Sequence, residues 1–358
     1  MMKNKYLLLL VLITGFLSCS TEDEPGLPEK EGEDFSNGTF ILNEGNYGSG
    51  NSSVSYLDPE MENITHTVFQ NENEGLPLGD VAQSIGFFED MAFVVLNVSN
   101  TIEVVDRKTF SRIATISTGL ENPRFITFSE GKAFVTNWGD GYDPDDDFVR
   151  VIDARSFAVE GSVSVAEGPD RVVSENGKVY VAHVGGYNFN NIVSVINAAT
   201  LNVEETLMVG DQPESLLIQN GNLWVLASGL PAYTQNETAG RISKFDLSDL
   251  TSTKEYNFPN ITDHPSKLRF DEGSLYYTVG KEVYSLDTSE EQLPDVPLFS
   301  MENVAVLYGF EVKDSRIFAT SATTDFTGNG RLLIYDLSGN LTGSFETGIN
   351  PNGIYFNE

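Results

Sequence analysis

Hydrophobic residues along most of this chain fall in short runs separated by clusters of Gly, Asn, Asp and Pro, and helical spacing is almost absent. The segment "GPDRVVSENGKVYVAH" at 168–183 has the pattern of two short strands around an Asn-Gly turn. The same pattern returns as "NPRFITFSEGKAFVTN" at 122–137, "QPESLLIQNGNLWVLA" at 212–227 and "HPSKLRFDEGSLYYTV" at 264–279. This recurring hairpin predicts an all-β chain built from repeats.

A third strand of each repeat ends in an apolar residue followed by Asp or Asn. These polar residues are Asp58, Asp106, Asp153, Asn197, Asp246, Asp287 and Asp336, and by subtraction of their numbers they lie 41 to 49 residues apart. Repeats of about 40–50 residues that carry four short strands are typical of propeller blades. The pattern therefore predicts a seven-bladed β-propeller over residues 37–358.

The two ends of the repeat region complement each other. The chain finishes with "PNGIYF" at 351–356, an innermost strand with no second strand after it, and the first strand, "GTFILNEG" from Gly38, has no innermost strand before it. Blades bury their faces only against neighbours, and an unpaired edge invites aggregation. We therefore expect the N-terminal strands to join the C-terminal innermost strand in one blade that closes the ring.

The residue at the start of each predicted innermost strand, just after the Pro where one is present, is polar. These residues are Gln83, Arg124, Asp170, Glu214, Ser266, Tyr308 and Asn352. Innermost strands line the central channel, so we expect this column at the channel mouth and treat all of it except Ser266 as candidate ligand-binding residues. Positions at the channel mouth of most propellers are hydrated and polar. The column therefore indicates where a ligand would bind, and says little about which ligand it is.

The predicted loops between second and third strands emerge on the same face and carry aromatic residues among Gly and Asn. We predict ligand contacts for Tyr47, Trp138, Tyr142, His183, Tyr187 and Tyr233 in these loops. Exposed aromatic side chains cost apolar hydration unless they cover something, and Tyr and Trp suit a partly wet ligand. The alternative is that these rings pack on one another as a lid over the blades.

Charge excludes two classes of partner. The chain holds 53 Asp and Glu against 21 Lys and Arg, a net charge of −32, so binding to nucleic acid or to an anionic lipid surface is not expected. The cluster of acidic residues at 140–147 could offer oxygen ligands to Ca²⁺, but it lacks the spacing of an EF-hand loop, and a solvated acidic loop is favoured. One cysteine and three histidines in separate blades make no zinc site. We predict no metal and no cofactor.

The N-terminus has the pattern of an export signal. Lys3 and Lys5 precede an apolar run that ends before Cys19, and "GFLSCS" resembles a bacterial lipobox. That resemblance implies a signal peptide over residues 1–18, lipidation of Cys19, and an acidic flexible tether over residues 19–36. A plain signal peptide with an incidental cysteine is the alternative.

Three segments carry a resemblance to a known family. "FILNEGNYGSGNSSVSYLDPE" at 40–60, "LGDVAQSIGF" at 78–87 and "TGINPNGIYF" at 347–356 resemble the YncE-like propeller lipoproteins of Bacteroidetes, and more specifically the surface vitamin B12 (cobalamin)-binding proteins of the BtuG type. The resemblance implies an outer-membrane lipoprotein that faces the cell exterior, binds a corrinoid on the loop face, and passes it to a TonB-dependent transporter. Asn46, Tyr47 and Gln83 are the residues it points to.

Two other functions stay open. The propeller could bind a glycan or a protein partner at the cell surface. It could also be a hydrolase or lactonase that uses Asp170 and Glu214 from adjacent blades as a carboxylate pair. Pairing of these carboxylates with Arg124 and Lys267 is the favoured interpretation, so we predict no catalytic residue and no enzymatic activity.

Overall fold

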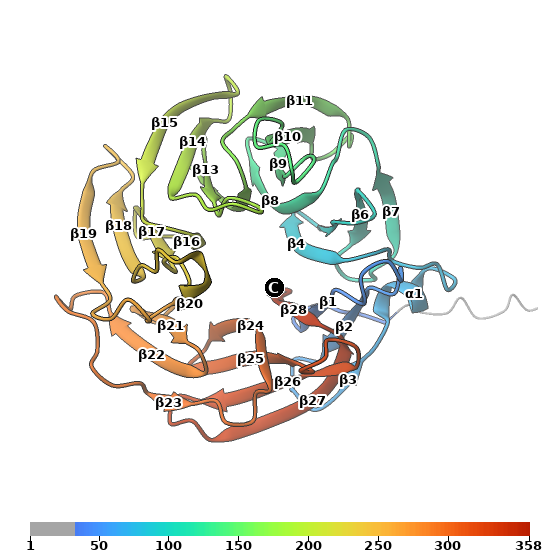
Figure 1. The fold of residues 1–358 in the computed structure, drawn as a ribbon. Helices are drawn as coiled ribbons and strands as arrows, with labels where there is room; N and C mark the ends of the chain where they lie inside the picture. Colours follow the sequence, from blue (N-terminus) through green and yellow to red (C-terminus); the bar gives the residue numbers. More distant parts are fainter. Residues whose placement is uncertain (1–32) are drawn as a thin grey trace, which may run out of the picture. The chain divides into compact units, whose positions relative to one another are not determined.

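The computed structural model describes residues 33–358, which form seven four-stranded antiparallel sheets arranged in a ring (Figure 1). The predicted seven-bladed β-propeller is confirmed. The predictions for residues 1–18, for Cys19 and for the tether up to residue 32 lie outside the described residues. Within 33–358, no helix has the length and hydrophobicity to cross a bilayer.

Six blades run from the channel outward in chain order, and the closing blade places the last strand innermost, before the first three. The innermost strands are β4 (Ala82–Phe88), β8 (Pro123–Ser129), β12 (Pro169–Glu175), β16 (Pro213–Gln219), β20 (Pro265–Asp271), β24 (Val306–Lys313) and β28 (Pro351–Phe356). The second strands are β5 (Met91–Leu96), β9 (Lys132–Asn137), β13 (Lys178–His183), β17 (Asn222–Ala227), β21 (Ser274–Val279), β25 (Arg316–Ala322) and β1 (Thr39–Asn43).

The outer half of each blade follows the same order. The third strands are β6 (Thr101–Asp106), β10 (Phe148–Asp153), β14 (Ile192–Asn197), β18 (Arg241–Asp246), β22 (Glu282–Asp287), β26 (Asn329–Asp336) and β2 (Ser53–Leu57). The outermost strands are β7 (Arg112–Ile116), β11 (Val159–Ser164), β15 (Asn202–Met208), β19 (Ser252–Asn257), β23 (Phe299–Ser300), β27 (Leu341–Ile349) and β3 (Ile64–Thr65). The helices α1 (Val68–Glu72) and η1 (Ala232–Thr234) are single short turns between strands.

The closing blade combines both ends of the described chain. Strand β1 pairs with β2 on one side and with the C-terminal strand β28 on the other, with Phe40 opposite Tyr355. In Figure 1 the blue β1 and the red β28 accordingly lie side by side. This confirms the predicted closure of the ring.

The packed part of the chain begins slightly earlier than the sequence indicates. Phe35 falls within the predicted tether, yet its ring is buried and contacts Phe40, Tyr56 and Phe110. Its carbonyl accepts a hydrogen bond from Asn357 Nδ2 at 2.8 Å. An apolar ring that covers the first blade interface stabilises the fold, so Phe35 belongs to the propeller.

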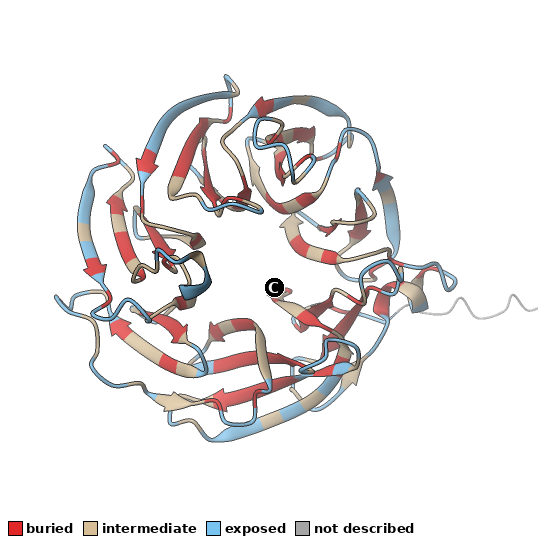
Figure 2. Cartoon of the chain, in the orientation of Figure 1, coloured by how far each residue is buried: buried red, intermediate tan, exposed pale blue. Residues whose placement is uncertain are grey.

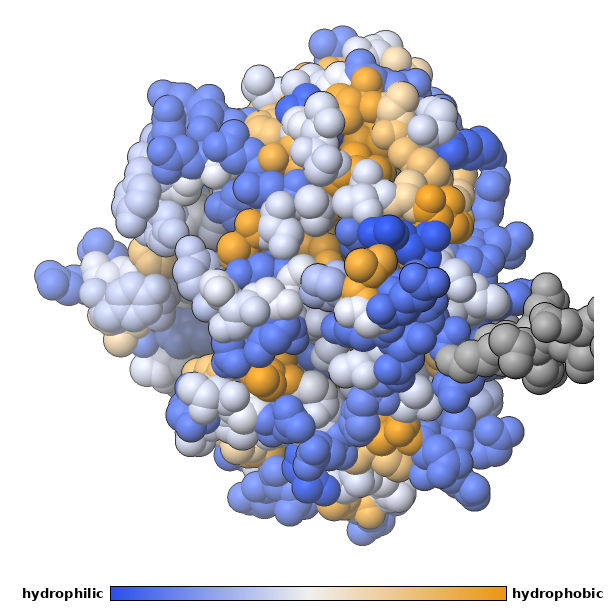
Figure 3. Space-filling view, turned by 90° about the vertical axis from the view of Figure 1, so that its right-hand side faces the viewer, coloured by the Kyte–Doolittle hydropathy of each residue, from blue (hydrophilic) through white to orange (hydrophobic). Residues whose placement is uncertain are grey.

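Hydrophobic cores lie between neighbouring blades. On β5, Ala92, Val94 and Leu96 pack toward the closing blade, whereas Phe93 and Val95 pack toward β9. Side chains alternate across a strand, and both faces of a blade are covered, so the middle of each second strand is mainly apolar. The outermost strands are largely exposed (Figure 2). Hydrophilic residues predominate on the side of the molecule seen in Figure 3, with smaller hydrophobic patches between them.

Candidate functional site

Every innermost strand carries a β-bulge near its start. Ala82 of β4 is opposite Leu96, and Ser84 is opposite the adjacent Val95, so Gln83 is left without a ladder partner. One extra residue interrupts each of the other six innermost strands in the same region. Bulges re-aim side chains and often lie beside functional sites. Here they release every member of the polar column except Ser266, which stays opposite Thr278, from the ladder at the mouth of the channel.

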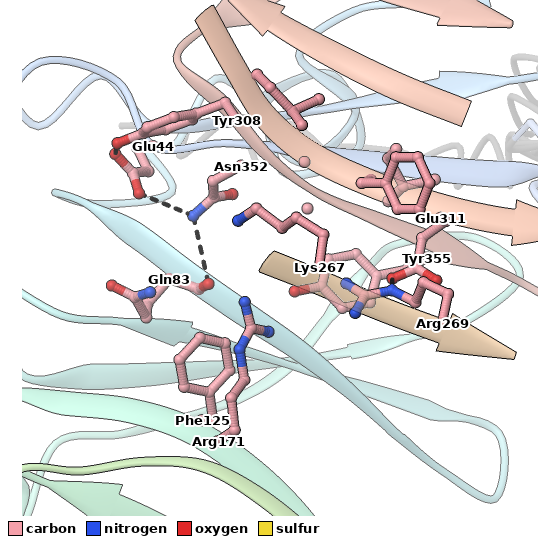
Figure 4. A pocket seen from close by; sticks show the side chains of 15 residues that line it. Glu44, Gln83, Phe125, Arg171, Lys267, Arg269, Tyr308, Glu311, Asn352 and Tyr355 are labelled. Atoms are coloured by element: carbon pink, nitrogen blue, oxygen red, sulfur yellow. Dashed lines mark hydrogen bonds and ion pairs between the residues drawn. The ribbon is translucent and has the colours of Figure 1, made fainter. Parts of the chain in front are cut away.

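One side of the mouth is held by a hydrogen-bonded group that we name the latch, consisting of Glu44, Asn46, Tyr308, Asn350 and Asn352. Tyr308 Oη donates to Glu44 Oε2 at 2.7 Å, and Asn352 Nδ2 donates to Glu44 Oε1 at 3.0 Å and to the Ala82 carbonyl at 2.9 Å. Figure 4 shows Glu44, Tyr308, Asn352 and Gln83 around one end of the cavity. Burial raises the pKa of Glu44, while these donors oppose the rise.

The outer part of the latch joins distant loops. Asn46 Nδ2 donates to the Phe326 carbonyl at 3.0 Å, and Asn350 Nδ2 donates to the carbonyls of Gly45 and Phe326. Asn46 therefore ties the β1–β2 loop to the β25–β26 loop. Tyr47, its neighbour, is 83% exposed.

Arg124 and Asp170 meet across neighbouring blades. Arg124 Nε lies 3.1 Å from Asp170 Oδ1, and its guanidinium lies 4.1 Å from the ring centroid of Trp138. Trp138 Nε1 donates to the Pro169 carbonyl at 3.0 Å. Trp138 is thus half-buried in the wall of the mouth, where it supports Arg124 as a cation–π partner.

Glu214 is occupied by its own surroundings. Ser215 Oγ donates to Glu214 Oε1 at 2.5 Å, and the backbone N–H of Lys267 donates to the same oxygen. Asp170 is paired with Arg124. The carboxylates of Asp170 and Glu214 therefore do not form a free acid–base pair. The favoured sequence interpretation placed Lys267 as an ion-pair partner, whereas the structure gives Glu214 the Lys267 backbone amide instead.

Below the mouth, two adjoining cavities fill the channel. The upper one has a volume of about 350 Å³ and is lined by charged residues that include Arg171, Lys267, Arg269 and Glu311. The lower one, of about 400 Å³, shares Arg171, Arg269 and Glu311 with it and is otherwise lined mainly by aliphatic residues of the innermost strands. Arg269 Nε and Glu311 Oε1 form an ion pair at 2.6 Å where the two cavities meet.

The loops of the other side carry a row of aromatic residues that we name the rim, consisting of Tyr142, Tyr187, Phe189 and Tyr233. Tyr142 stacks on Tyr187 with ring centroids 5.0 Å apart and planes at 22°, and Phe189 contacts Tyr233 at 6.2 Å. Tyr142 remains 87% exposed in spite of this contact. A Cβ at Gly141 would lie 2.4 Å from the Tyr187 ring, so the stack requires glycine at that position.

His183 does not reach the mouth, which corrects the prediction that it contacts a ligand. Its side chain is completely buried, with Nδ1 2.8 Å from the Ala166 carbonyl and Nε2 2.9 Å from Ser194 Oγ. Burial lowers its pKa to about 4, so the ring is neutral near pH 7. His183 is the last residue of β13. Its ring turns into the blade and anchors the loop before β12 through the Ala166 carbonyl.

The acidic loop before β10 contains one deeply buried carboxylate. Asp147 Oδ1 accepts a hydrogen bond from the Gly168 backbone N–H at 3.2 Å, and burial raises the Asp147 pKa to about 7. Among residues 33–358, no group of three or more His, Cys, Asp and Glu side chains is arranged to hold a metal ion.

Sequence reasoning missed most of the residues that give the channel its charge; among those of the upper cavity it named only Lys267, as a partner for the Asp170 and Glu214 carboxylates. Glu44 lies inside the "NEGNYG" segment but was passed over for Asn46 and Tyr47 beside it. Arg171 and Lys267 directly follow members of the polar column, and strict strand alternation would turn them away from the channel. The bulges in β12 and β20 place these residues in the cavity lining. Charged residues in an otherwise apolar innermost strand were the available signal.

Comparisons with known proteins agree with the fold. Residues 37–334 match the family described as "Domain of unknown function (DUF5074)". A search of curated proteins finds no match.

Solved structures with a similar fold have low sequence identity to this chain. A quinonprotein alcohol dehydrogenase-like protein from Bacteroides thetaiotaomicron superposes with a TM-score of 0.67 at 16% identity, covering 91% of this chain and 79% of that chain. Dihydro-heme d1 dehydrogenase NirN in complex with DHE gives a TM-score of 0.58 at 15% identity, covering 92% and 77%. AztD from Citrobacter koseri gives 0.53 at 13% identity, covering 88% and 96%. At such identities the likeness concerns the fold alone.

Proposed function

We propose that this chain, which belongs to the DUF5074 family, binds a large and partly apolar organic ligand, a corrinoid, on the loop face of its propeller. The observation that carries the proposal is the rim. Tyr142, Tyr187 and Tyr233 are exposed next to a polar channel mouth, and their side chains make no hydrogen bond within residues 33–358. Exposed rings of this kind are typical of surfaces that cover a partner.

The chemistry of the face suits a corrinoid. A corrinoid has a broad macrocycle fringed with amides, so it needs aromatic surface together with hydrogen-bonding groups rather than one sign of charge. The rim offers the aromatic surface. Gln83 and the paired Arg124 and Asp170 offer donors and acceptors at the adjoining mouth. Binding is favoured over catalysis because Asp170 and Glu214 are both engaged within the protein.

The cellular setting completes the proposal. Lipidation at Cys19 anchors the protein in the outer membrane, where it faces the cell exterior and passes its ligand to a TonB-dependent transporter. Exchange of Cys19 for Ser tests the anchor: the protein is expected to leave the membrane fraction. Retention of the variant in that fraction would contradict a lipid anchor at this residue.

Titration calorimetry with cyanocobalamin tests the ligand. The chain from residue 20 onward contains the compact unit 33–358 and is the form to use. We expect tight one-to-one binding, weakened about tenfold or more by Tyr142→Ala or Tyr187→Ala because each removes apolar contact area. Met208→Ala, which changes an exposed apolar residue on the outermost strand β15, is the matched control and should bind normally.

Absence of binding by the unmodified protein would reject the corrinoid and leave the propeller fold unaffected. Glycans and protein partners would then be tested against the same variants. Equal loss of affinity in Met208→Ala would instead place the ligand away from the rim.

A further inference from the structure

Two cations in the upper channel cavity form no ion pair with any of residues 33–358. The Lys267 ammonium makes no hydrogen bond or ion pair within the described residues, although its backbone N–H binds Glu214. The Arg171 guanidinium lies 4.0 Å from the ring centroid of Phe125 and likewise forms no ion pair there. Figure 4 shows both side chains extending into the space between Asn352 and the Arg269–Glu311 pair.

The carboxylates around this space are already engaged. Asp170 pairs with Arg124, and Glu311 pairs with Arg269. The other two carboxylates accept hydrogen bonds from neutral donors, Glu44 from Tyr308 and Asn352, and Glu214 from Ser215 and a backbone amide. Four cations and four carboxylates thus occupy the channel, but their arrangement leaves the charges of Arg171 and Lys267 uncompensated by contact.

An uncompensated cation inside a protein carries a desolvation cost that a bound anion relieves. Burial lowers the pKa of Lys267, with Arg171 and Arg269 adding to the shift and Glu214 opposing it. This cavity also contrasts with the whole chain, whose net charge is −32. The acidic surface repels anions in general. The cations gathered in this cavity instead attract an anion that is small enough to fit inside it.

We propose that the upper cavity binds a small oxyanion, a carboxylate or phosphate group, between Lys267 and Arg171. The volume of about 350 Å³ lies within the range of pockets that hold small organic molecules. Lysine supplies a compact charge and arginine a planar fork of donors, and both form short charge-assisted hydrogen bonds with oxyanions. This site lies in the channel and does not depend on the rim or on a corrinoid.

Thermal unfolding and calorimetry with two probes test the site and the source of the oxyanion. Inorganic phosphate and succinate are titrated separately into the chain from residue 20 onward, in buffer free of other multivalent anions. A ligand that binds the folded state raises the unfolding temperature with its concentration. We expect at least one probe to do so, and the stronger of the two identifies phosphate or carboxylate as the preferred group.

Variants locate the effect. Lys267→Met and Arg171→Met each remove one charge and are expected to lower the affinity for the preferred probe about tenfold or more. Arg155→Met removes an exposed arginine that pairs with Glu89 on the outer surface, and it should bind like the unmodified protein. If Lys267→Met fails to fold, Arg171→Met alone decides the outcome.

Two results would overturn the proposal: stabilisation by neither probe, or equal stabilisation of the unmodified protein and Arg171→Met. Neither measurement contains a corrinoid, so these results are independent of the titration with cyanocobalamin. A corrinoid binder without an anion site, and an anion binder without a corrinoid site, therefore give distinguishable outcomes.

Discussion

The latch and the rim lie on two sides of one channel mouth, and their side chains are used in opposite ways. In the latch, the amide nitrogens of Asn46, Asn350 and Asn352 all donate to groups of the protein itself. In the rim, the tyrosine side chains touch other rings and are otherwise open to water. A side chain satisfied within the fold contributes to stability, whereas one left open is available to a ligand. Composition alone does not separate these roles.

The largest effect is expected on the latch side, from removal of residues 351–358. This deletion takes away β28, so β1 loses one of its two partners and the closing blade loses its channel wall. Without closure, the interface that contains Phe40 and Leu42 opens to water. We expect no cooperative thermal transition by circular dichroism. A sharp transition near that of the full chain would show that the latch side is not needed for the fold.

Asn350→Ala is the next test of the latch. Asn350 is buried, donates to the carbonyls of Gly45 and Phe326, and has a φ of 53°, where Asn is tolerated better than Ala. Loss of one buried and one partly buried hydrogen bond and the added backbone strain should lower the free energy of unfolding by about 2–4 kcal/mol in urea titrations. Asn46→Ala removes two exposed hydrogen bonds, the one it donates to the Phe326 carbonyl and the one it accepts from Asn51, and is the matched control, with an expected loss of about 1 kcal/mol.

The sequence predicted those features of the fold that recur in every blade, and it did not predict the contacts that differ between blades. The hairpin pattern and the Asp or Asn at the end of each third strand recur in every blade, so the propeller and its closure could be predicted from the spacing of these residues. The polar column recurs too, and Gln83, Tyr308 and Asn352 do line the upper cavity.

The individual contacts depend on burial that the strand pattern does not show. His183 ends β13 at the position that Asn137 has in β9, and both side chains are completely buried and have two hydrogen-bond partners within the fold. Lys267 enters the channel because a bulge shifts it by one position. Burial and bulges are set by neighbouring blades, so a single strand pattern cannot supply them.

The loops that carry the rim contain two buried titratable groups, His183 and Asp147, so the pH dependence of stability tests this side of the mouth. The pKa of His183 falls from 6.5 to about 4 in the folded protein because of burial. Between these values the unfolded chain binds a proton that the folded chain does not. His183 therefore contributes fully to the free energy of unfolding above about pH 6.5. This contribution, up to about 3 kcal/mol, is lost as the pH falls toward 4.

Asp147 acts in the opposite direction in the same pH range. Burial raises its pKa from 3.8 to about 7, so the folded state holds a proton that the unfolded state releases, and its contribution is lost as the pH rises through 7. The two effects oppose each other between about pH 4 and 6.5. Relative to the unmodified protein, Asp147→Asn should lose stability more steeply on acidification, and His183→Gln less steeply. Parallel curves for all three proteins in urea titrations would contradict these assignments.

Tyr142→Ala is expected to have the smallest effect on stability. The ring is 87% exposed and its stack on Tyr187 is its main contact, so the free energy of unfolding should change by less than about 1 kcal/mol. The same substitution should weaken ligand binding strongly, because a bound ligand would cover the exposed face of the ring. A loss above about 2 kcal/mol in urea titrations would mean that the rim holds the fold together as the latch does. The aromatic lid considered from the sequence would then account for these residues without a ligand.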